Sequence, residues 1–330
     1  MLSWPRLVTA LAALVPVAAF AFIIGSVVAT SAPAITQIGA GLLGTHFAGT
    51  NQHQAETAYG LVAPLYGTVL MALIALAVAV PGALALAVLM EEFPLGWLGR
   101  ALPPTLGFIA GIPPIVYALL GLVLLESVVR PKFGAIELDD EHVKAAIQGL
   151  PTFSSIRLPI GLPNSQLLGG VVLALLIVPL IAPLVADALH GVPADLRRAS
   201  YALGAGRWHT LIHVVLPTAL PGIVGAATLG ALKATGEVTI PYFFVSYGLE
   251  VVQLPSPLWD VLWHTQPLSS TGAILLGGFN TEGNGTGVQG VPLAVAYTTG
   301  VVLLLLAFAL MGLASLVHTW LARGDARDAQ

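Results

Sequence analysis

The sequence contains no cysteine among its 330 residues, and only 8% of those residues carry a charge. The absence of thiols excludes disulfides, thiol catalysis and metal sites with cysteine ligands. Such sparse charge excludes a soluble domain, in which about a quarter of the residues are charged. The formal net charge of −4 is small and spread along the chain, so nucleic acid is not expected as a partner. With 57% hydrophobic residues and a mean hydropathy of +0.91, the sequence indicates an integral membrane protein.

Apolar runs long enough to cross a bilayer recur along the chain. A membrane helix needs about 20 apolar residues, and several of these runs are longer, so tilt or extension beyond the bilayer is expected. Prolines inside the runs free carbonyl groups that neighbouring helices must satisfy, which favours a packed bundle of kinked helices. The six expected spans are 7–29, 62–90, 104–128, 166–186, 218–245 and 291–321.

The first apolar run could instead be a signal peptide. Arg6 precedes the run, and ATSAPA at 29–34 resembles a small-residue cleavage site. The apolar stretch of a signal peptide is about 7–15 residues long, and the run at 7–29 is longer. We therefore expect an uncleaved first span.

The distribution of Lys and Arg predicts which loops face the cytoplasm, because cytoplasmic loops carry an excess of both. With both termini inside, seven arginines fall on cytoplasmic segments and four basic residues fall on external loops. The external segments 30–61 and 246–290 contain no Lys or Arg. We therefore expect a multi-pass protein of the cell membrane (the inner or plasma membrane), with both termini in the cytoplasm.

Two external segments are long enough to carry structure of their own. A short helix is expected at Asp140–Gln148, within a mixed segment. The segment 267–290 is rich in Gly, Asn and Thr. Glycine and asparagine adopt turns readily, so this segment is expected to be a flexible loop.

The longest polar interruption with a regular pattern lies between the fourth and fifth spans, at 187–217. It reads DALHGVPADLRRASYALGAGRWHTLIHVVLP and holds three of the twelve Lys and Arg residues. Pro193 suits the first turn of a helix, and Gly204 suits a helix end or turn. We expect two helices, 194–203 and 207–216, that lie along the cytoplasmic surface before the next span begins.

Part of this segment, RASYALGAGRWHTLIHVVLP, resembles the "EAA" loop of ABC-transporter permeases. That loop has Glu-Ala-Ala, then a glycine, and ends in hydrophobic-x-Leu-Pro. The surrounding chain looks most like the phosphate-uptake (Pst-type) permeases, notably in YGTVLMALIALAVAVPGALALAVLMEE at 66–92 and GIPPIVYALLG at 111–121. The resemblance runs from about residue 60 to about 245. Within the loop, the matching positions are Ala199, Gly204, Val214, Leu216 and Pro217.

In the family that the chain resembles, the short helix of this loop docks into a groove on a separate ATPase subunit. Arg198 stands where the family usually has the Glu, and Ser200 replaces the second Ala, so the docking chemistry is expected to differ. An ordinary basic loop that only fixes the topology is the alternative. The residues that the resemblance assigns to coupling are Arg197, Arg198, Ala199, Gly204, Arg207, Leu216 and Pro217.

Two ionisable residues, Lys233 and Glu237, lie inside the fifth expected span. Charged side chains at membrane depth are costly, so they usually face a cavity or a partner. Their i, i+4 spacing places both on one face of a helix. We hypothesise that Lys233 supplies positive potential to a translocating anion and that Glu237 orients the Lys233 ammonium or partly neutralises its charge, while Thr235 and Thr239 add hydroxyl groups. The alternative is an internal ion pair that only holds helices together.

The phosphate-uptake permeases have Arg-Ala-Leu-Gly-Glu-Thr at the matching place, where this chain reads KATGEV at 233–238. A guanidinium grips phosphate through two parallel hydrogen bonds, whereas the ammonium of Lys233 acts as a point charge. The resemblance therefore implies an oxyanion substrate, with phosphate first and phosphonate, sulfate or molybdate as alternatives.

Other groups of polar residues give weaker indications of function. His209 and His213 have the i, i+4 spacing of helical zinc ligands, but no Glu follows His209 and no metal site is expected. Glu91 and Glu92 end the second span on its cytoplasmic side. No catalytic cluster stands out, so an intramembrane enzyme is the less favoured reading. The chain also lacks a Gly-x-x-x-x-Gly-Lys-Ser/Thr loop, so no cofactor is expected in it, and ATP–Mg is expected on another chain.

Taken with the resemblance, these features predict an all-α polytopic membrane protein of about six transmembrane helices. It would have a type I ABC importer (MetI-like) permease core and a cytoplasmic coupling helix between spans four and five. The implied partners are two ATP-binding subunits, a second permease chain (a homologue or a copy of itself), an external phosphate-binding protein and the bilayer. A membrane sensor without transport is the remaining alternative. The expected division is 1–60, a core at 61–245 and 246–330.

Overall fold

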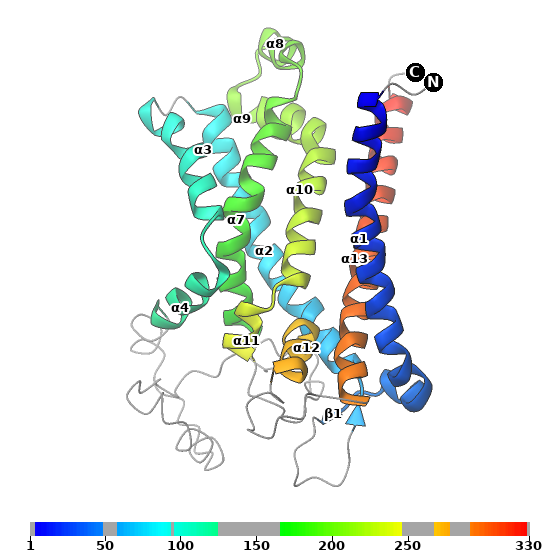
Figure 1. Ribbon diagram of the computed structural model, residues 1–330. Helices are drawn as coiled ribbons and strands as arrows, with labels where there is room; N and C mark the ends of the chain where they lie inside the picture. The colour runs from blue at the N-terminus through cyan, green and yellow to red at the C-terminus, as the bar shows by residue number, and fades with distance from the viewer. Residues whose placement is uncertain are drawn as a thin grey trace.

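The computed structural model describes residues 4–48, 58–93, 96–124, 166–245, 267–277 and 291–328. In these residues the chain is almost entirely helical, and the long helices run side by side (Figure 1). Five helices in the described part are long and apolar enough to cross a membrane, and a bent pair raises the number to six if it counts as one span. The predicted all-α polytopic fold is therefore confirmed.

The long helices correspond to five of the six expected spans. They are α1 (Trp4–Ile38), α2 (Val62–Glu92), α7 (Gln166–His190), α10 (Leu216–Gly236) and α13 (Val291–Asp328). Shorter helices connect or flank them: α3 (Trp97–Ala110), α4 (Pro114–Leu124), α8 (Ala194–Ala202), α9 (Arg207–Thr210), α11 (Thr239–Val245) and α12 (Leu268–Gly277).

Four small elements complete the described structure. A 3₁₀ turn, η1 (Gly39–Leu43), ends α1, and a π-helical turn, η3 (Leu211–Val215), joins α9 to α10. Strands β1 (Phe47–Ala48) and β2 (Ala58–Tyr59) pair antiparallel before α2 begins. The sequence pattern gave no sign of this short pairing.

Helices α2 and α7 form the centre of the bundle, because small residues let them pack closely. Gly170 of α7 lies against Ile74 of α2, where an added Cβ would come within 2.6 Å of the Ile74 Cγ2 atom. Helix α2 buries an alanine every three or four residues, so one continuous stripe faces the core. The members of this stripe are Ala72, Ala75, Ala79, Ala83 and Ala87.

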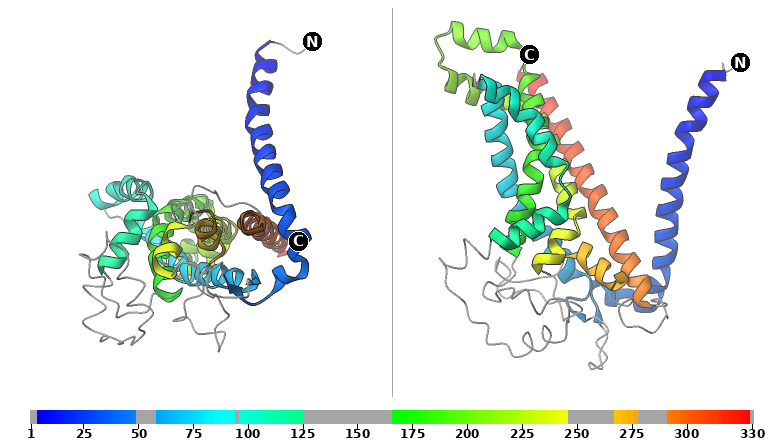
Figure 2. Two further views of the ribbon diagram at one scale, coloured as in Figure 1. Left: turned by 60° about the horizontal axis from the view of Figure 1, so that its bottom comes forward. Right: turned by 60° about the vertical axis from the view of Figure 1, so that its left-hand side comes forward.

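Helices α1 and α13 lie outside this centre and contact each other. Both expose apolar side chains, between Leu14 and Ile35 in α1 and between Leu305 and Trp320 in α13, and α1 leans away from the bundle toward its N-terminal end (Figure 2). A second buried cluster joins α1, the β1–β2 pair, α12 and α13 near the other end. Apolar sides of this kind are what lipid contact requires, since a bilayer offers no hydrogen bonds.

The third expected span, 104–128, was wrong as a single helix. The chain forms α3 and α4 instead, bent by 97° at the break between them. Pro113 has no N–H to donate to the carbonyl of Ile109, and a residue that precedes a proline avoids helical geometry. The Tyr117 hydroxyl donates to that same Ile109 carbonyl at 2.7 Å and so bridges the bend.

The fifth expected span, 218–245, was wrong in its continuity. Helix α10 ends at Gly236, and Glu237 adopts an extended backbone with ψ of 132°. The chain then forms α11 as a separate short helix. Pro241 of α11 has no N–H to offer to the carbonyl of Glu237, which makes that carbonyl available to a partner from elsewhere.

The expected flexible loop at 267–290 was wrong over its first part, where α12 forms. The Leu268 N–H at the start of α12 donates to Thr68 Oγ1 of α2 at 2.8 Å. Residues 278–290 and the helix expected at Asp140–Gln148 lie outside the described residues. The division of the chain at residues 60 and 245 stays a prediction.

Candidate functional site

The polar segment between α7 and α10 folds into two short helices, as the sequence predicted. Helix α8 begins directly after Pro193. Gly204 has φ of +85°, a backbone conformation that suits glycine because other residues are strained there. Helix α9 then continues through η3 into α10 and does not end separately. We call the segment from Ala194 to Thr210 the polar cap; it projects beyond the ends of the long helices (Figure 1).

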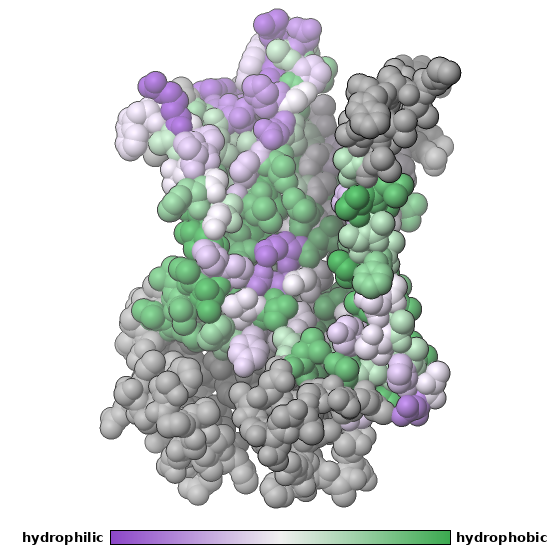
Figure 3. All heavy atoms as spheres, viewed as in Figure 1, coloured by the Kyte–Doolittle hydropathy of each residue, from purple (hydrophilic) through white to green (hydrophobic). Residues whose placement is uncertain are grey.

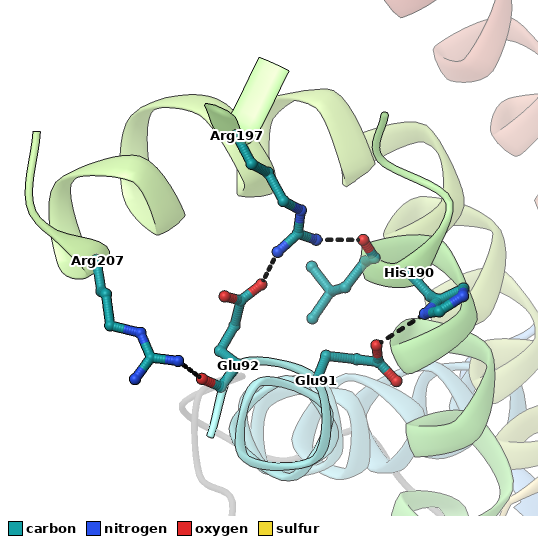
Figure 4. Close-up of polar contacts among 6 residues, drawn as sticks. Glu91, Glu92, His190, Arg197 and Arg207 are labelled. Carbon is teal, nitrogen blue, oxygen red and sulfur yellow. Dashed lines mark hydrogen bonds and ion pairs between the residues drawn. The ribbon is translucent and has the colours of Figure 1, made fainter. Parts of the chain in front are cut away.

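The arginine in the middle of α8, Arg197, turns back toward the long helices (Figure 4). Its guanidinium pairs with the carboxylate of Glu92 at the end of α2, and its Nη2 donates to the carbonyl of Leu189 in α7 at 2.7 Å. The side chains of Arg197 and Glu92 are 21% and 12% exposed. This pair is therefore shielded from water more than an ordinary surface ion pair.

A second arginine of the polar cap reaches the same residue of α2. Arg207 Nη2 donates to the backbone carbonyl of Glu92 at 2.7 Å. Its guanidinium carbon lies 5.9 Å from the centre of the Phe93 ring, and that ring packs against Trp208. The last carbonyls of a helix lack partners within it, so Arg207 supplies one from outside.

The other residues predicted for coupling lie differently. The Arg198 side chain is 79% exposed, and its Nη1 lies 3.3 Å from Asp195 Oδ1 in the same helix. Ala199 and Gly204 are exposed on the polar cap, whereas Leu216 and Pro217 begin α10. The predicted set thus falls into residues that attach the polar cap to α2 and residues that face outward. The outward apolar side chains of the polar cap include Leu196, Tyr201, Leu203 and Trp208.

The charged pair within the fifth span comes together as expected. Lys233 Nζ lies 2.7 Å from Glu237 Oε2. The Glu237 side chain is 5% exposed and the Lys233 side chain is 38% exposed. The second carboxylate oxygen of Glu237 accepts from the Thr239 N–H at 3.1 Å. One carboxylate oxygen of Glu237 therefore binds the backbone just after the break between α10 and α11, and the other binds Lys233.

The two threonines predicted beside this pair contribute unequally. Thr239 contacts Glu237 through its backbone N–H. Thr235 is buried and its hydroxyl donates to the Leu232 carbonyl at 3.1 Å, within its own helix. The structure thus brings Lys233, Glu237 and Thr239 into direct contact, with Thr235 alongside.

Residues of α12 and α2 that sequence reasoning missed support this pair from outside α10. Ser269 Oγ donates to the backbone carbonyl of Glu237 at 2.7 Å. The neighbouring residue Leu268 is tied to Thr68, whose hydroxyl also donates to the Pro64 carbonyl at 3.0 Å. Single hydroxyls in apolar or loop-like segments give no pattern that could have revealed these contacts.

The chemistry of the Lys233–Glu237 pair suits an anion that binds briefly. An ammonium has three donors, and the described contacts of Lys233 use one of them. The more exposed Lys233 side chain can therefore offer N–H groups to oxygen atoms, while the buried carboxylate lowers the net charge. A hydrophilic patch interrupts the apolar face of the molecule over the end of α10 (Figure 3).

Metal binding finds no support in the described residues. The rings of His209 and His213 stack 4.2 Å apart, and His213 Nδ1 lies 3.1 Å from the His209 carbonyl. Among the described residues as a whole, no three His, Asp or Glu side chains are grouped so that they could hold a metal ion.

Comparisons with known proteins identify the family of the chain. Residues 80–323 match the family described as "Binding-protein-dependent transport system inner membrane component". The chain is 30% identical to the Haemophilus influenzae protein named phosphate transport system permease protein PstC, over 83% of this chain and 81% of that protein. A Xylella fastidiosa protein of the same name is 31% identical over 60% of each chain, so the match spans less than two thirds of that relative.

Among solved structures, a chain of a bacterial alginate ABC transporter has a similar fold. That transporter was crystallised in complex with a periplasmic protein bound to an alginate pentasaccharide. The TM-score is 0.58, and the match covers 93% of this chain and 92% of the other. With 14% sequence identity, this likeness concerns the fold alone.

Proposed function

The chain belongs to the family of binding-protein-dependent transport system inner membrane components, and from this premise we propose that it is the permease subunit of an ATP-driven importer of inorganic phosphate. The observation that carries the proposal is the polar cap between two membrane helices, with outward apolar side chains at its tip. The relatives named as phosphate transport permeases support the substrate.

The polar cap is the surface that we propose for an ATP-binding subunit. Leu203 at its tip is 89% exposed, next to the tight turn at Gly204. An exposed apolar side chain on a polar cap suits a groove on a partner protein. The chain itself lacks a phosphate-binding loop for ATP, so we propose that hydrolysis takes place on two separate ATPase subunits and that this chain is not an enzyme.

We propose that the polar cap and both termini face the cytoplasm. The start of α1 and the end of α13 lie at the same end of the molecule as α8 (Figure 1), which supports this topology. The opposite end would receive an external phosphate-binding protein. A second permease chain, homologous or identical, would complete the pathway. ATP binding would then draw the two polar caps together and open the cavity outward, and hydrolysis would reset it inward.

Lys233 is the residue that we propose for phosphate contact within the pathway, with Glu237 limiting how tightly the anion is held. Passage requires release, so a fully compensated ammonium suits a transport site better than a cluster of cations. An ammonium lacks the two-pronged geometry with which Arg grips phosphate. This observation keeps another oxyanion, such as sulfate, molybdate or phosphonate, as the second candidate substrate.

The decisive experiment reconstitutes the permease with its ATPase, second permease chain and binding protein in proteoliposomes. Phosphate is expected to stimulate ATP hydrolysis and to accumulate inside, whereas sulfate at the same concentration is not. If sulfate or molybdate stimulated ATP hydrolysis and phosphate did not, that anion would take the place of phosphate as the proposed substrate. Failure of the chain to co-purify with any ATPase would overturn the importer and favour a membrane sensor.

A further inference from the structure

We propose that helix α2 transmits displacement of the polar cap to the Lys233–Glu237 pair, and that Glu92 is the residue that positions the cap on α2. This inference rests on the proposed function, because it concerns how ATP-driven displacement reaches the substrate pathway. Glu92 would be a positioning residue, since it touches neither ATP nor the transported anion.

The first step is the double attachment at Glu92. Its carboxylate holds Arg197 of α8, and its backbone carbonyl holds Arg207 of α9. These two arginines lie on opposite sides of the turn at Gly204, so one residue of α2 fixes both arms of the polar cap (Figure 4). Two cations at the C-terminal end of a helix also complement its dipole.

The polar cap is closed on itself, which lets it move as one piece. The hydroxyl groups of Ser200 in α8 and Thr210 in α9 lie 2.9 Å apart and form a hydrogen bond. The covalent route from the cap into α10 runs instead through η3, a π-helical turn. Such turns occur where a helix departs from its regular geometry. The cap therefore has two routes into the bundle, one along the backbone through η3 into α10 and one through Glu92 into α2, and the proposal concerns the second.

The second step is the attachment at the other end of α2. Thr68, in the second turn of α2, accepts the Leu268 N–H, and the adjacent Ser269 donates to the Glu237 carbonyl. The Glu237 carboxylate in turn holds Lys233. Helix α2, which contains Pro81, thus runs between the end that carries the cap and the end that braces the charged pair. Contiguous packed and hydrogen-bonded elements can carry coupling between distant sites, and a measured coupling is what establishes such a route.

The test measures how many phosphate ions are transported for each ATP hydrolysed by the reconstituted complex. Glu92→Gln keeps the backbone carbonyl that holds Arg207 but removes the charge that holds Arg197. We expect this ratio to fall about fivefold or more, the scale of an ordinary coupling free energy, while the complex still assembles and hydrolyses ATP. The matched control is Glu91→Gln, because Glu91 bonds His190 of α7 at 3.1 Å and does not hold the cap.

A second variant separates coupling from simple misfolding. Arg197→Gln removes the other partner of the same ion pair, so the double variant with Glu92→Gln should lower the ratio no further than the worse single variant. The inference would be overturned if the losses of the two single variants added up in the double variant. It would also be overturned if Glu92→Gln left the number of phosphate ions transported for each ATP unchanged. If the unmodified complex transported no phosphate at all, the proposed substrate would fail and the coupling would be tested by a structural readout.

That structural readout uses the absence of cysteine from the chain. Cysteines introduced at the exposed residues Ala202 of the cap and Ala77 of α2 accept spin labels without background from this chain, and the partner chains are used in cysteine-free form. We expect the distance between the labels to keep one narrow distribution through the ATP cycle in the complex and in Glu91→Gln. The distribution should broaden in Glu92→Gln. A narrow distribution in Glu92→Gln would show that the cap and α2 move together without this residue.

Discussion

Two charged sites among the described residues are built in opposite ways. Lys233 and Glu237 are four residues apart and belong to one stretch of chain. Glu92 instead joins Arg197 and Arg207, which are 105 and 115 residues away along the chain. The first site is therefore local, whereas the second exists only because α2, α7, α8 and α9 meet (Figure 4).

Exposure separates the two sites as clearly as sequence distance does. In the local pair the acid is buried and the base is partly open, at 5% and 38% exposed. At the end of α2 both partners are largely covered, at 12% for Glu92 and 21% for Arg197. An open ammonium can take a new partner, which suits a substrate site. A pair whose members are both covered suits a mechanical attachment.

The largest effect is expected from Lys233→Met, which removes the charge at the local site and keeps the apolar stem. Glu237 would be left buried without its cation, a loss that commonly costs about 3–5 kcal/mol. We expect phosphate transport by the reconstituted complex to fall about a hundredfold or more. Lys233→Arg should retain transport. Normal transport by an assembled Lys233→Met complex would make the pair a structural one.

A smaller effect on transport is expected from Glu237→Gln, which should raise the affinity of the site for the anion and not lower it. The amide oxygen can still accept the Thr239 N–H, but Lys233 loses its counter-charge. We expect the anion to be held more tightly, so the KM for transport falls while the maximal rate falls about tenfold, because tighter binding slows release. Initial-rate measurements over a range of phosphate concentrations test this. Equal KM values in the variant and the unmodified complex would remove Glu237 from substrate binding.

A stability effect is expected where α2 and α7 pack between the two sites. In Gly170→Ala the added methyl would meet Ile74 at 2.6 Å, so the helices must separate. Overpacking of this kind costs about 1–3 kcal/mol, and thermal unfolding in detergent should shift to lower temperature. Gly225→Ala in α10 is the matched control, because nothing lies within 4 Å of its Cβ position. Similar midpoints for both variants would argue against a tight α2–α7 contact.

The pairing in the local site could be predicted because Lys233 and Glu237 are only four residues apart. The continuous helix assumed for that prediction was wrong, since α10 ends at Gly236 and Glu237 has an extended backbone, yet the Lys233 ammonium still lies 2.7 Å from the carboxylate. The helix pair around Gly204 was likewise predicted, since proline and glycine act on the backbone where they stand.

The long-range site could not be predicted, because no local rule relates Glu92 to Arg197. The sequence placed Glu92 at the end of a span and Arg197 in a short helix between two spans, and both placements agree with the structure. That the arginine points back to α2 depends on how α2 and α7 pack. The bend between α3 and α4 is a different case, because Pro113 and Pro114 signal a kink locally in a run that hydropathy alone reads as continuous, while the size of the bend, 97°, was not predicted.

The smallest effect is expected from Ser269→Ala, which removes the outer brace of the local site. The Glu237 carbonyl would lose one hydrogen bond, worth about 0.5–1.5 kcal/mol, so the KM for phosphate should change by about two- to tenfold. Ser270→Ala is the matched control: Ser270 is also buried, but its hydroxyl bonds Pro267 at 3.0 Å. Both variants should lower thermal stability alike, and only Ser269→Ala should alter transport. Equal transport in both would mean that α12 stabilises the bundle without positioning Glu237.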